Sequence, residues 1–375
     1  MRRREVTALM SACAFVPAWA SSDAVDTTLI VAAWRGAEPD SPQRVGVLGA
    51  DWQAREVRVH WQHAVPTRAH GFEIDRHGIV AVALRPGAWL MRFDRDDGRV
   101  LARSKPVAPM RGAAATDLRF NGHAVTSQDG TRLYATMTDA LSGAGWIGVH
   151  DAATLEPVDA WPSHGVDPHQ LLLDREGLLM VAHGGIHRGP GDRKLDLDRM
   201  DSSLVRIDPR NGRLIARWQL DDRRLSLRHL AWSASTDGAS PLLGIALQAE
   251  HDDAARRREA PALAVWDGER LTVPTHDAQA QGYAGDIAPA HDGGFVISNP
   301  RAAQVLWWTP SQPAALHPVA RLHEAYALAA WPQEGEAGAL IAAARGIGRW
   351  HPSIDPAMLP WPQPMALDNH WMRLA

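Results

Sequence analysis

The feature of this sequence that most constrains its fold is a repeat of short apolar segments. The segments are about five to eight residues long and are separated by Gly, Asp, Asn and Pro, while amphipathic stretches long enough for a capped helix are hard to find. The clearest copy begins at His123, turns at Asp129-Gly130 and continues with apolar segments at 133–137 and 145–151. This pattern predicts an all-β chain.

Other copies keep the same spacing between their first polar residue and their turn. His70, His123, His169 and His229 each stand seven to nine residues ahead of the glycine that ends a turn. A fifth copy has Asp286 in place of the histidine. Four histidines in one register are therefore expected to lie at equivalent places in four consecutive units.

The number and length of the units favour one closed architecture. A weaker sixth copy starts at Tyr326, and the segment 27–61 supplies a further unit, which makes seven units of about 50 residues. No linker rich in Gly, Ser or Pro divides the chain into a pair of β-sandwiches. We predict a single seven-bladed β-propeller of four-stranded antiparallel blades over residues 21–375.

The first twenty residues have the pattern of a cleaved export signal. Arginines at 2–4 precede a short apolar run at 6–16, and Ala20 ends a small-x-small cleavage pattern. The run is too short to span a bilayer, and no later segment has the length that a membrane helix needs. We expect export to the periplasm by the general or the twin-arginine route, with lipid anchoring at Cys13 as the less favoured alternative.

Composition narrows the chemistry that the mature chain can use. Cys13 is the only cysteine and leaves with the signal, so a metal would have to be held by His, carboxylate or backbone oxygen. The net charge of −4 and the lack of basic runs argue against a nucleic-acid partner. The 16 tryptophans and 18 histidines are high counts for this length, and most of the tryptophans are expected to pack between blades.

The four histidines in register are the predicted metal ligands. The first strand of a propeller blade lines the central channel, so His70, His123, His169 and His229 should lie side by side at one channel mouth. Neutral imidazole binds iron, copper and zinc without help from thiolates. The alternative is that these side chains only satisfy backbone groups around a water-filled channel, and the sequence leaves both open.

A wider set of residues is predicted to bind a ligand on the same face. Each member starts a first strand or lies in a loop beside one, and Arg228 and Arg301 would steer anions. The predicted ligand-binding residues are His70, His123, His164, His169, His183, Arg228, His229, Asp286 and Arg301.

Several motifs make the chain similar to a bacterial family of exported proteins, the domain of unknown function 1513. The matching segments lie at 70–71, 122–130, 148–151, 164–169, 182–186, 194–205, 226–230 and 368–370. The resemblance implies a seven-bladed propeller and no established activity. It also implies gene neighbours that encode imelysin-type peptidases and dihaem oxidoreductase-like proteins of iron acquisition, which would be envelope partners. His183 and Gln170 replace an asparagine and a glutamate of the family pattern, which weakens a carboxylate-assisted metal site.

These observations favour a periplasmic accessory protein that binds a metal, a metal complex or a partner protein at the histidine face. One alternative is a metal-dependent hydrolase or lactonase-like propeller enzyme, although carboxylates are scarce at the first-strand positions. Another alternative is an interaction scaffold that uses the long loops at 183–200 and 248–261, with the histidines in structural roles.

Overall fold

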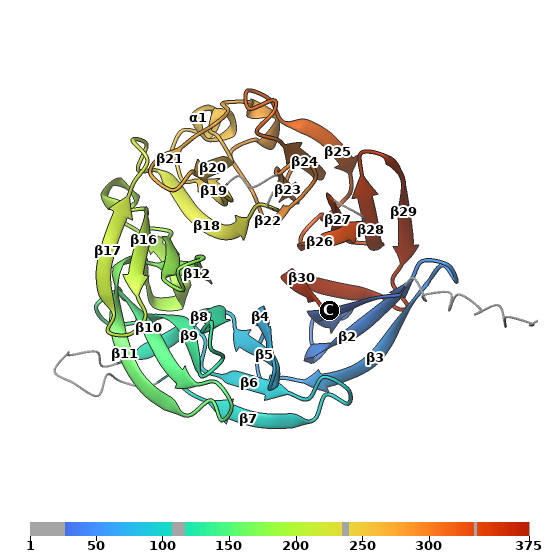
Figure 1. The fold of residues 1–375 in the computed structure, drawn as a ribbon, viewed down its shortest axis with the longest axis horizontal. Coiled ribbons are helices and arrows are strands. Elements are labelled where there is room, and N and C mark those ends of the chain that lie inside the picture. Colours follow the sequence, from blue (N-terminus) through green and yellow to red (C-terminus); the bar gives the residue numbers. More distant parts are fainter. Residues whose placement is uncertain (1–26, 107–116, 235–239, 334–335, 375) are drawn as a thin grey trace, which may run out of the picture.

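The chain forms a ring of seven four-stranded antiparallel sheets, as predicted (Figure 1). The computed structural model describes residues 27–374 except 107–116, 235–239 and 334–335. The proposed export signal at 1–20, including Cys13, lies outside the described residues. Within the described part of the chain, no helix has the length and apolar character that crossing a bilayer requires.

Each sheet is one blade that runs from an inner strand near the axis to an outer strand at the rim (Figure 1). The first three blades, each given from the inner to the outer strand, have these bounds. Blade 1 consists of β30 (Met365–Arg373), β1 (Thr27–Gly36), β2 (Gln43–Asp51) and β3 (Glu56–Ala64). Blade 2 consists of β4 (Ala69–Asp75), β5 (Gly78–Ala83), β6 (Leu90–Phe93) and β7 (Val100–Ser104). Blade 3 consists of β8 (Leu118–Thr126), β9 (Arg132–Asp139), β10 (Ala144–Asp151) and β11 (Pro157–Val166).

The remaining blades follow in chain order. Blade 4 consists of β12 (Pro168–Leu173), β13 (Leu179–His183), β16 (Ser203–Asp208) and β17 (Arg213–Trp218). Blade 5 consists of β18 (Leu225–Trp232), β19 (Leu243–Ala249), β20 (Leu263–Trp266) and β21 (Leu271–Thr272). Blade 6 consists of β22 (Asp286–Pro289), β23 (Phe295–Asn299), β24 (Gln304–Trp308) and β25 (His317–Arg321). Blade 7 consists of β26 (Leu328–Gln333), β27 (Glu336–Ala343), β28 (Gly346–His351) and β29 (Ile354–Pro360).

Short elements decorate the loops of blades 4 and 5. Between β13 and β16, blade 4 carries the hairpin of β14 (His187–Gly189) and β15 (Arg193–Leu195), with the 3-10 turns Pro190–Asp192 and Leu197–Arg199. The helix α1 (Ala254–Glu259) lies between β19 and β20, and the 3-10 turn Ala278–Ala280 follows β21.

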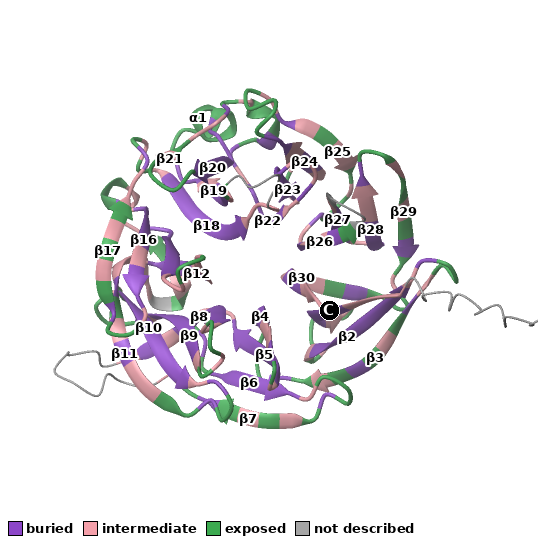
Figure 2. Cartoon of the chain, viewed as in Figure 1, coloured by how far each residue is buried: buried purple, intermediate pink, exposed green. Residues whose placement is uncertain are grey.

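The apolar runs in the sequence become second and third strands that are buried on both faces. In β5 every residue is buried, and the alternation of the strand sends Ile79 and Ala81 toward blade 1 and Val80 and Val82 toward blade 3. Outer strands such as β17 alternate between exposed and half-buried residues, as the burial colours of Figure 2 show. The position of a strand within its blade therefore determines whether its residues alternate between buried and exposed.

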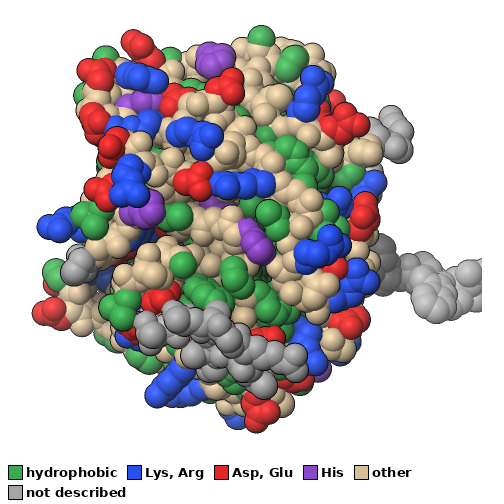
Figure 3. All heavy atoms as spheres, turned by 90° about the vertical axis from the view of Figure 1, so that its left-hand side faces the viewer, with side chains coloured by type: hydrophobic (Ala, Val, Ile, Leu, Met, Phe, Trp, Pro, Cys, Tyr) green, Lys and Arg blue, Asp and Glu red, His purple; other side chains and the backbone are tan. Residues whose placement is uncertain are grey.

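Packing between blades supplies the core of the protein. Seven clusters of buried apolar side chains occupy the seven interfaces between neighbouring blades. Tryptophans contribute to these clusters, for example Trp146 between blades 2 and 3 and Trp266 between blades 4 and 5. The surface face in Figure 3 carries acidic and basic side chains that are interspersed with one another.

The two ends of the described chain close the ring. β30 pairs antiparallel with β1 from Gly36 opposite Met365 to Ile30 opposite Arg373, so the C-terminal strand is the inner strand of the N-terminal blade. The inner strands then contact one another in the circular order β30, β4, β8, β12, β18, β22 and β26. Residues far apart in the sequence can therefore meet at the axis.

A buried ion pair links blade 2 to blade 3. Arg92 is 1% exposed, and its two terminal nitrogens donate to the carboxylate of Asp75 at 2.5 and 2.8 Å. Arg92 also donates to the carbonyl of Ala152, and Thr126 Oγ1 donates to Asp75 at 3.1 Å. Burial alone would raise the pKa of Asp75, but the hydrogen bonds and the charge of Arg92 outweigh it and lower this pKa.

We predict that Asp75→Ala destabilises the fold by about 3–5 kcal/mol, because it leaves the Arg92 guanidinium buried without its counterion. Chemical denaturation measures this loss. As a matched control, Glu176→Ala removes an acid whose side chain is 72% exposed and which pairs with Arg206 at 3.1 Å; its cost should stay below about 1 kcal/mol. Equal costs for the two variants would contradict the structural role of the buried pair.

Candidate metal centre

Five of the seven inner strands carry a β-bulge, and each bulge contains a histidine. The register between inner and second strand shifts around His70 in β4, His123 in β8, His169 in β12 and His229 in β18. In β30 the same shift spans residues 368–370 and includes His370. A bulge re-aims a side chain, and these five bulges aim imidazoles at the axis of the ring.

The five imidazoles form one buried cluster, called here the histidine cluster. The distances between ring centroids range from 4.2 Å for His229–His370 to 6.3 Å for His70–His229. The five residues are between 2% and 8% exposed, so they lie inside the ring rather than on an open rim. The structure thus brings together His70, His123, His169 and His229, as predicted, and adds His370.

Two sets of potential metal ligands share this space. His70, His123, His169 and His229 each offer a ring nitrogen within 4.8 Å of the others. His229 and His370 form a second such set together with a carboxylate oxygen of Asp286. The two sets have His229 in common, so the histidine cluster offers nitrogen donors on one side and a mixed nitrogen and oxygen environment on the other.

The imidazoles cannot satisfy one another by hydrogen bonding alone. The Nε2 atom of His229 lies 2.8 Å from Nε2 of His169 and 2.9 Å from Nε2 of His370, but one ring nitrogen offers only one hydrogen or one lone pair. In addition, Nε2 of His70 and of His123 and Nδ1 of His169 and of His229 are buried without a hydrogen-bond partner among the described residues. Converging nitrogens of this kind suit a bound cation that accepts their lone pairs.

Two aspartates fix the orientation of two of the rings. Asp368 Oδ1 lies 2.9 Å from Nδ1 of His70, and Asp286 Oδ1 lies 3.3 Å from Nδ1 of His370. Asp286 is held by the backbone N–H groups of Ile287 and Leu328. A carboxylate at Nδ1 favours the tautomer with hydrogen on that atom, which leaves the Nε2 lone pair free for a metal.

Burial keeps the four imidazoles of His70, His123, His169 and His229 neutral. Desolvation, helped by the neighbouring imidazole of His370, lowers the pKa of His70 to about 4 even though Asp368 opposes the shift. Burial also lowers the pKa of His123, His169 and His229 well below the ordinary value. For Asp368, burial alone would raise the pKa, but the hydrogen bond from His70 and the charge of Arg68 hold it at about 2. Neutral imidazole is the form that binds metals.

The other predicted ligand-binding residues have separate partners. Nε2 of His164 lies 2.8 Å from the carbonyl of Gly212 in a half-buried position. His183 is fully buried at the end of β13, where its Nε2 lies 2.9 Å from Ser163 Oγ. These contacts hold loops and strands together.

The two predicted arginines also differ from one another. Arg301 stacks over the ring of Tyr283 at 3.7 Å, and Arg228 is buried beside Asp167 at 3.1 Å. Arg228 immediately precedes His229, and its positive charge helps to lower the pKa of that imidazole after burial and the neighbouring imidazoles. Of the two arginines, Arg228 is the one whose charge affects the pKa of a cluster histidine.

Sequence reasoning missed His370 and Asp368 as site residues. They belong to the last strand of the chain, and the segment 27–61 supplies only the second, third and outer strands of blade 1. The absence of an inner strand from this segment could have pointed to His370 and Asp368, because a closed propeller needs an inner strand in every blade and here it comes from the other end of the chain. Carboxylates were expected to be scarce at the first-strand positions, yet Asp286 in β22 and Asp368 in β30 both contact the histidine cluster.

Comparisons with known proteins agree with the fold. A protein from Lactobacillus plantarum superimposes with a TM-score of 0.59 and 12% identity, over 93% of this chain and 100% of that one. Kuenenia stuttgartiensis hydrazine synthase superimposes with a TM-score of 0.57 and 12% identity, over 84% of this chain and 93% of that one. A streptogramin B lyase superimposes with a TM-score of 0.52 and 12% identity, over 89% of this chain and 87% of that one. At this identity the likeness shows the fold alone.

The sequence comparisons point to one family. The comparison with curated proteins found no match. Residues 63–374, which include all five cluster histidines, match a family described as a protein of unknown function, DUF1513. The chain belongs to the DUF1513 family.

Proposed function

We propose that this protein binds a transition-metal ion at the histidine cluster. The observation that carries the proposal is the convergence of five buried imidazoles whose nitrogens have more lone pairs and hydrogens facing one another than they can pair. Imidazole donors without thiolates suit iron, copper or zinc rather than magnesium or calcium.

Binding would require a small outward movement of the rings. Tetrahedral zinc with bonds of about 2.0–2.1 Å to nitrogen separates neighbouring ligand atoms by about 3.3 Å. The Nε2 atoms of His169, His229 and His370 are 2.8 and 2.9 Å apart, so shifts of about half an ångström accommodate the ion.

The cellular role is proposed to be metal handling, iron acquisition in particular, by an accessory protein of the periplasm. The export-signal pattern at 1–20 supports the location. The family resemblance supports imelysin-type peptidases and dihaem oxidoreductase-like proteins as envelope partners. Metal binding at the histidine cluster can be tested without knowing these partners.

The first test is elemental analysis of protein purified without chelators or an affinity tag. We expect iron, copper or zinc at close to one ion per chain, and its loss in the double variant His123→Gln/His169→Gln. The control double variant His60→Gln/His323→Gln removes two exposed imidazoles and should keep the metal. Thermal unfolding establishes that each variant is folded. Equal metal content in the two folded variants, or none in the wild type even after incubation with each ion, would contradict the proposal.

A second prediction concerns Asp368, which positions the His70 ring. Asp368→Asn should weaken zinc affinity by about 10–100-fold, because the amide no longer favours hydrogen on Nδ1 of His70. Calorimetric titration of metal-free protein with Zn²⁺ measures the change. Asp355→Asn, at an exposed position in β29, has the same loss of charge and should bind like the wild type. An unchanged affinity in Asp368→Asn would remove Asp368 from the metal site.

A third prediction concerns the pH dependence of stability in the metal-free protein. Burial lowers the pKa values of His70, His123, His169 and His229 in the folded protein, so the unfolded chain binds more protons below about pH 6.5. Stability is therefore fully present above that pH and is lost as the pH falls toward 4, where His70 titrates.

Each neutral imidazole contributes up to about 1.4 kcal/mol per pH unit to this slope. Chemical denaturation between pH 4.5 and 7.5 should show a shallower slope for His123→Gln/His169→Gln than for the wild type. His60→Gln/His323→Gln serves as the control and should follow the wild type. Parallel curves for the cluster variant and the wild type would show that these imidazoles are not held neutral by the fold.

A further inference from the structure

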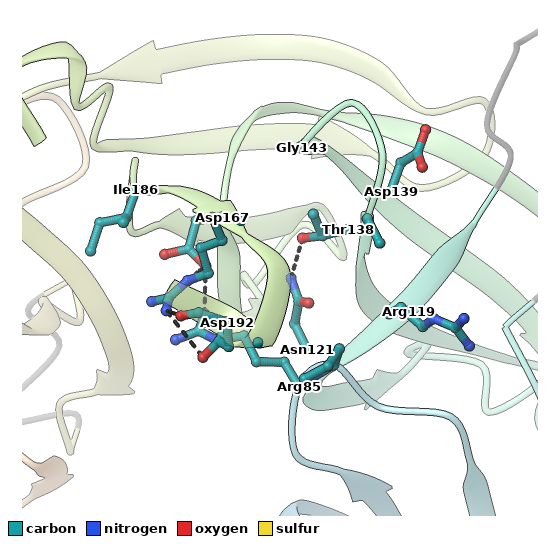
Figure 4. Close-up of a pocket in the computed structure, with 14 residues that line it drawn as sticks. Arg85, Arg119, Asn121, Thr138, Asp139, Gly143, Asp167, Ile186 and Asp192 are labelled. Atoms are coloured by element: carbon teal, nitrogen blue, oxygen red, sulfur yellow. Dashed lines mark hydrogen bonds and ion pairs between the residues drawn. The ribbon is translucent and has the colours of Figure 1, made fainter. Parts of the chain in front are cut away.

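A second site lies beside the histidine cluster, where blades 2, 3 and 4 meet the β14–β15 hairpin. A cavity of about 180 Å³ opens there (Figure 4). Its lining carries Arg85, Arg188 and two aspartates joined to them, together with apolar groups such as Pro86 and Ile186. A cavity of about 150 Å³ is sufficient for a benzene ring, so this one is large enough for a small organic molecule.

The charged wall is built around one buried carboxylate. Asp167 is 3% exposed and contacts three arginines: Arg85 Nη1 at 2.5 Å, Arg188 Nε at 3.3 Å and Arg228 Nη1 at 3.1 Å. Burial alone would raise the pKa of Asp167, but the three guanidinium charges outweigh it and lower this pKa. One carboxylate cannot neutralise three arginines, so positive charge remains at the wall.

Arg228 is the innermost of the three arginines and is not saturated by hydrogen bonds. It is 2% exposed, and its Nε has no hydrogen-bond partner among the described residues. Its guanidinium lies against the backbone at Gly184, where a Cβ atom would approach Nη1 to 2.9 Å. A side chain at position 184 would therefore displace either Arg228 or Asp167.

Asp192 occupies the accessible side of the arginine pair. Its carboxylate lies 3.1 Å from Nη1 of Arg188 and 3.4 Å from Nε of Arg85, and the side chain is 35% exposed. It stands at the end of the hairpin turn with a φ of 61°, a left-handed conformation that aspartate adopts more readily than most residues with a side chain. The three arginines outnumber these two aspartates by one charge, while the other charged residues of the lining, Arg119 and Asp139, offset each other.

We propose that this cavity binds a small organic carboxylate, which takes the place of the Asp192 side chain between Arg85 and Arg188. Guanidinium groups recognise carboxylates by charge and hydrogen bonding, and the Asp192 carboxylate already forms an ion pair with one nitrogen of each of these two arginines. The apolar side chains of Pro86 and Ile186 in the lining can contact the body of the ligand. The partly exposed Asp192 is displaced, while the buried Asp167 stays and holds the three arginines in place.

The test is calorimetric titration of chelator-treated, metal-free full-length protein with benzoate, a carboxylate on an apolar body. We expect saturable binding that is about tenfold tighter in Asp192→Asn, which removes the internal competitor, and lost in Arg188→Gln. Asp198→Asn lies in the same loop insertion and is exposed, so it removes the same charge from a place without the arginine pair. It should match the wild type.

Two other probes test separately whether the apolar body or the negative charge of benzoate is sufficient for binding. Benzyl alcohol keeps the apolar body and phosphate keeps a negative charge, and both should bind more weakly than benzoate. Phosphate binding as tight as benzoate would overturn the assignment to carboxylates, and benzoate binding that survives in folded Arg188→Gln would overturn the site. Repeating the titration in His123→Gln/His169→Gln shows that the result does not depend on the metal proposal, because the benzoate affinity should be unchanged there.

Discussion

Apolar packing between neighbouring blades is the constraint on which the rest of this structure depends. No blade has a core of its own, since its second and third strands bury one face against the preceding blade and the other against the following one. A sheet with two apolar faces is stable in water only when both are covered, and a closed ring of seven covers all of them. The polar functions are left to the inner strands and the loops, where apolar packing is not required.

The inner strands use that freedom in an unusual way. A buried ring nitrogen without a hydrogen-bond partner costs free energy, and the histidine cluster holds four that have none among the described residues. The bulges that aim the rings also interrupt the pairing of β4, β8, β12, β18 and β30 with their neighbours. The two inner strands without a bulge, β22 of blade 6 and β26 of blade 7, contribute Asp286 and backbone groups instead of a histidine. The seven apolar clusters between the blades supply the stability that offsets these costs.

Local signals explain why the architecture could be predicted and why part of the site could not. Strand length, turn residues and the spacing of His70, His123, His169 and His229 from their turns are properties of neighbouring residues, so the sequence displays them directly. His370 enters the histidine cluster only through the pairing of β30 with β1, a contact across the whole chain. The same limit applies to Asp167, whose three arginine partners come from three different loops and strands. His164 and His183 are among the predicted ligand-binding residues because the sequence does not reveal that Gly212 and Ser163 are their partners.

The pairing of β30 with β1 has a consequence for the time at which the protein can acquire its site. Synthesis proceeds from the N-terminus, so the strand that carries Asp368 and His370 is made after the other six inner strands. Blades 2 to 6 can assemble while the chain is still being made, but the fifth imidazole and the aspartate of His70 arrive only with β30. A chain that stops before β30 lacks these two side chains, and the proposed metal site would be complete only in the closed ring. Closure of the ring therefore also completes the histidine cluster.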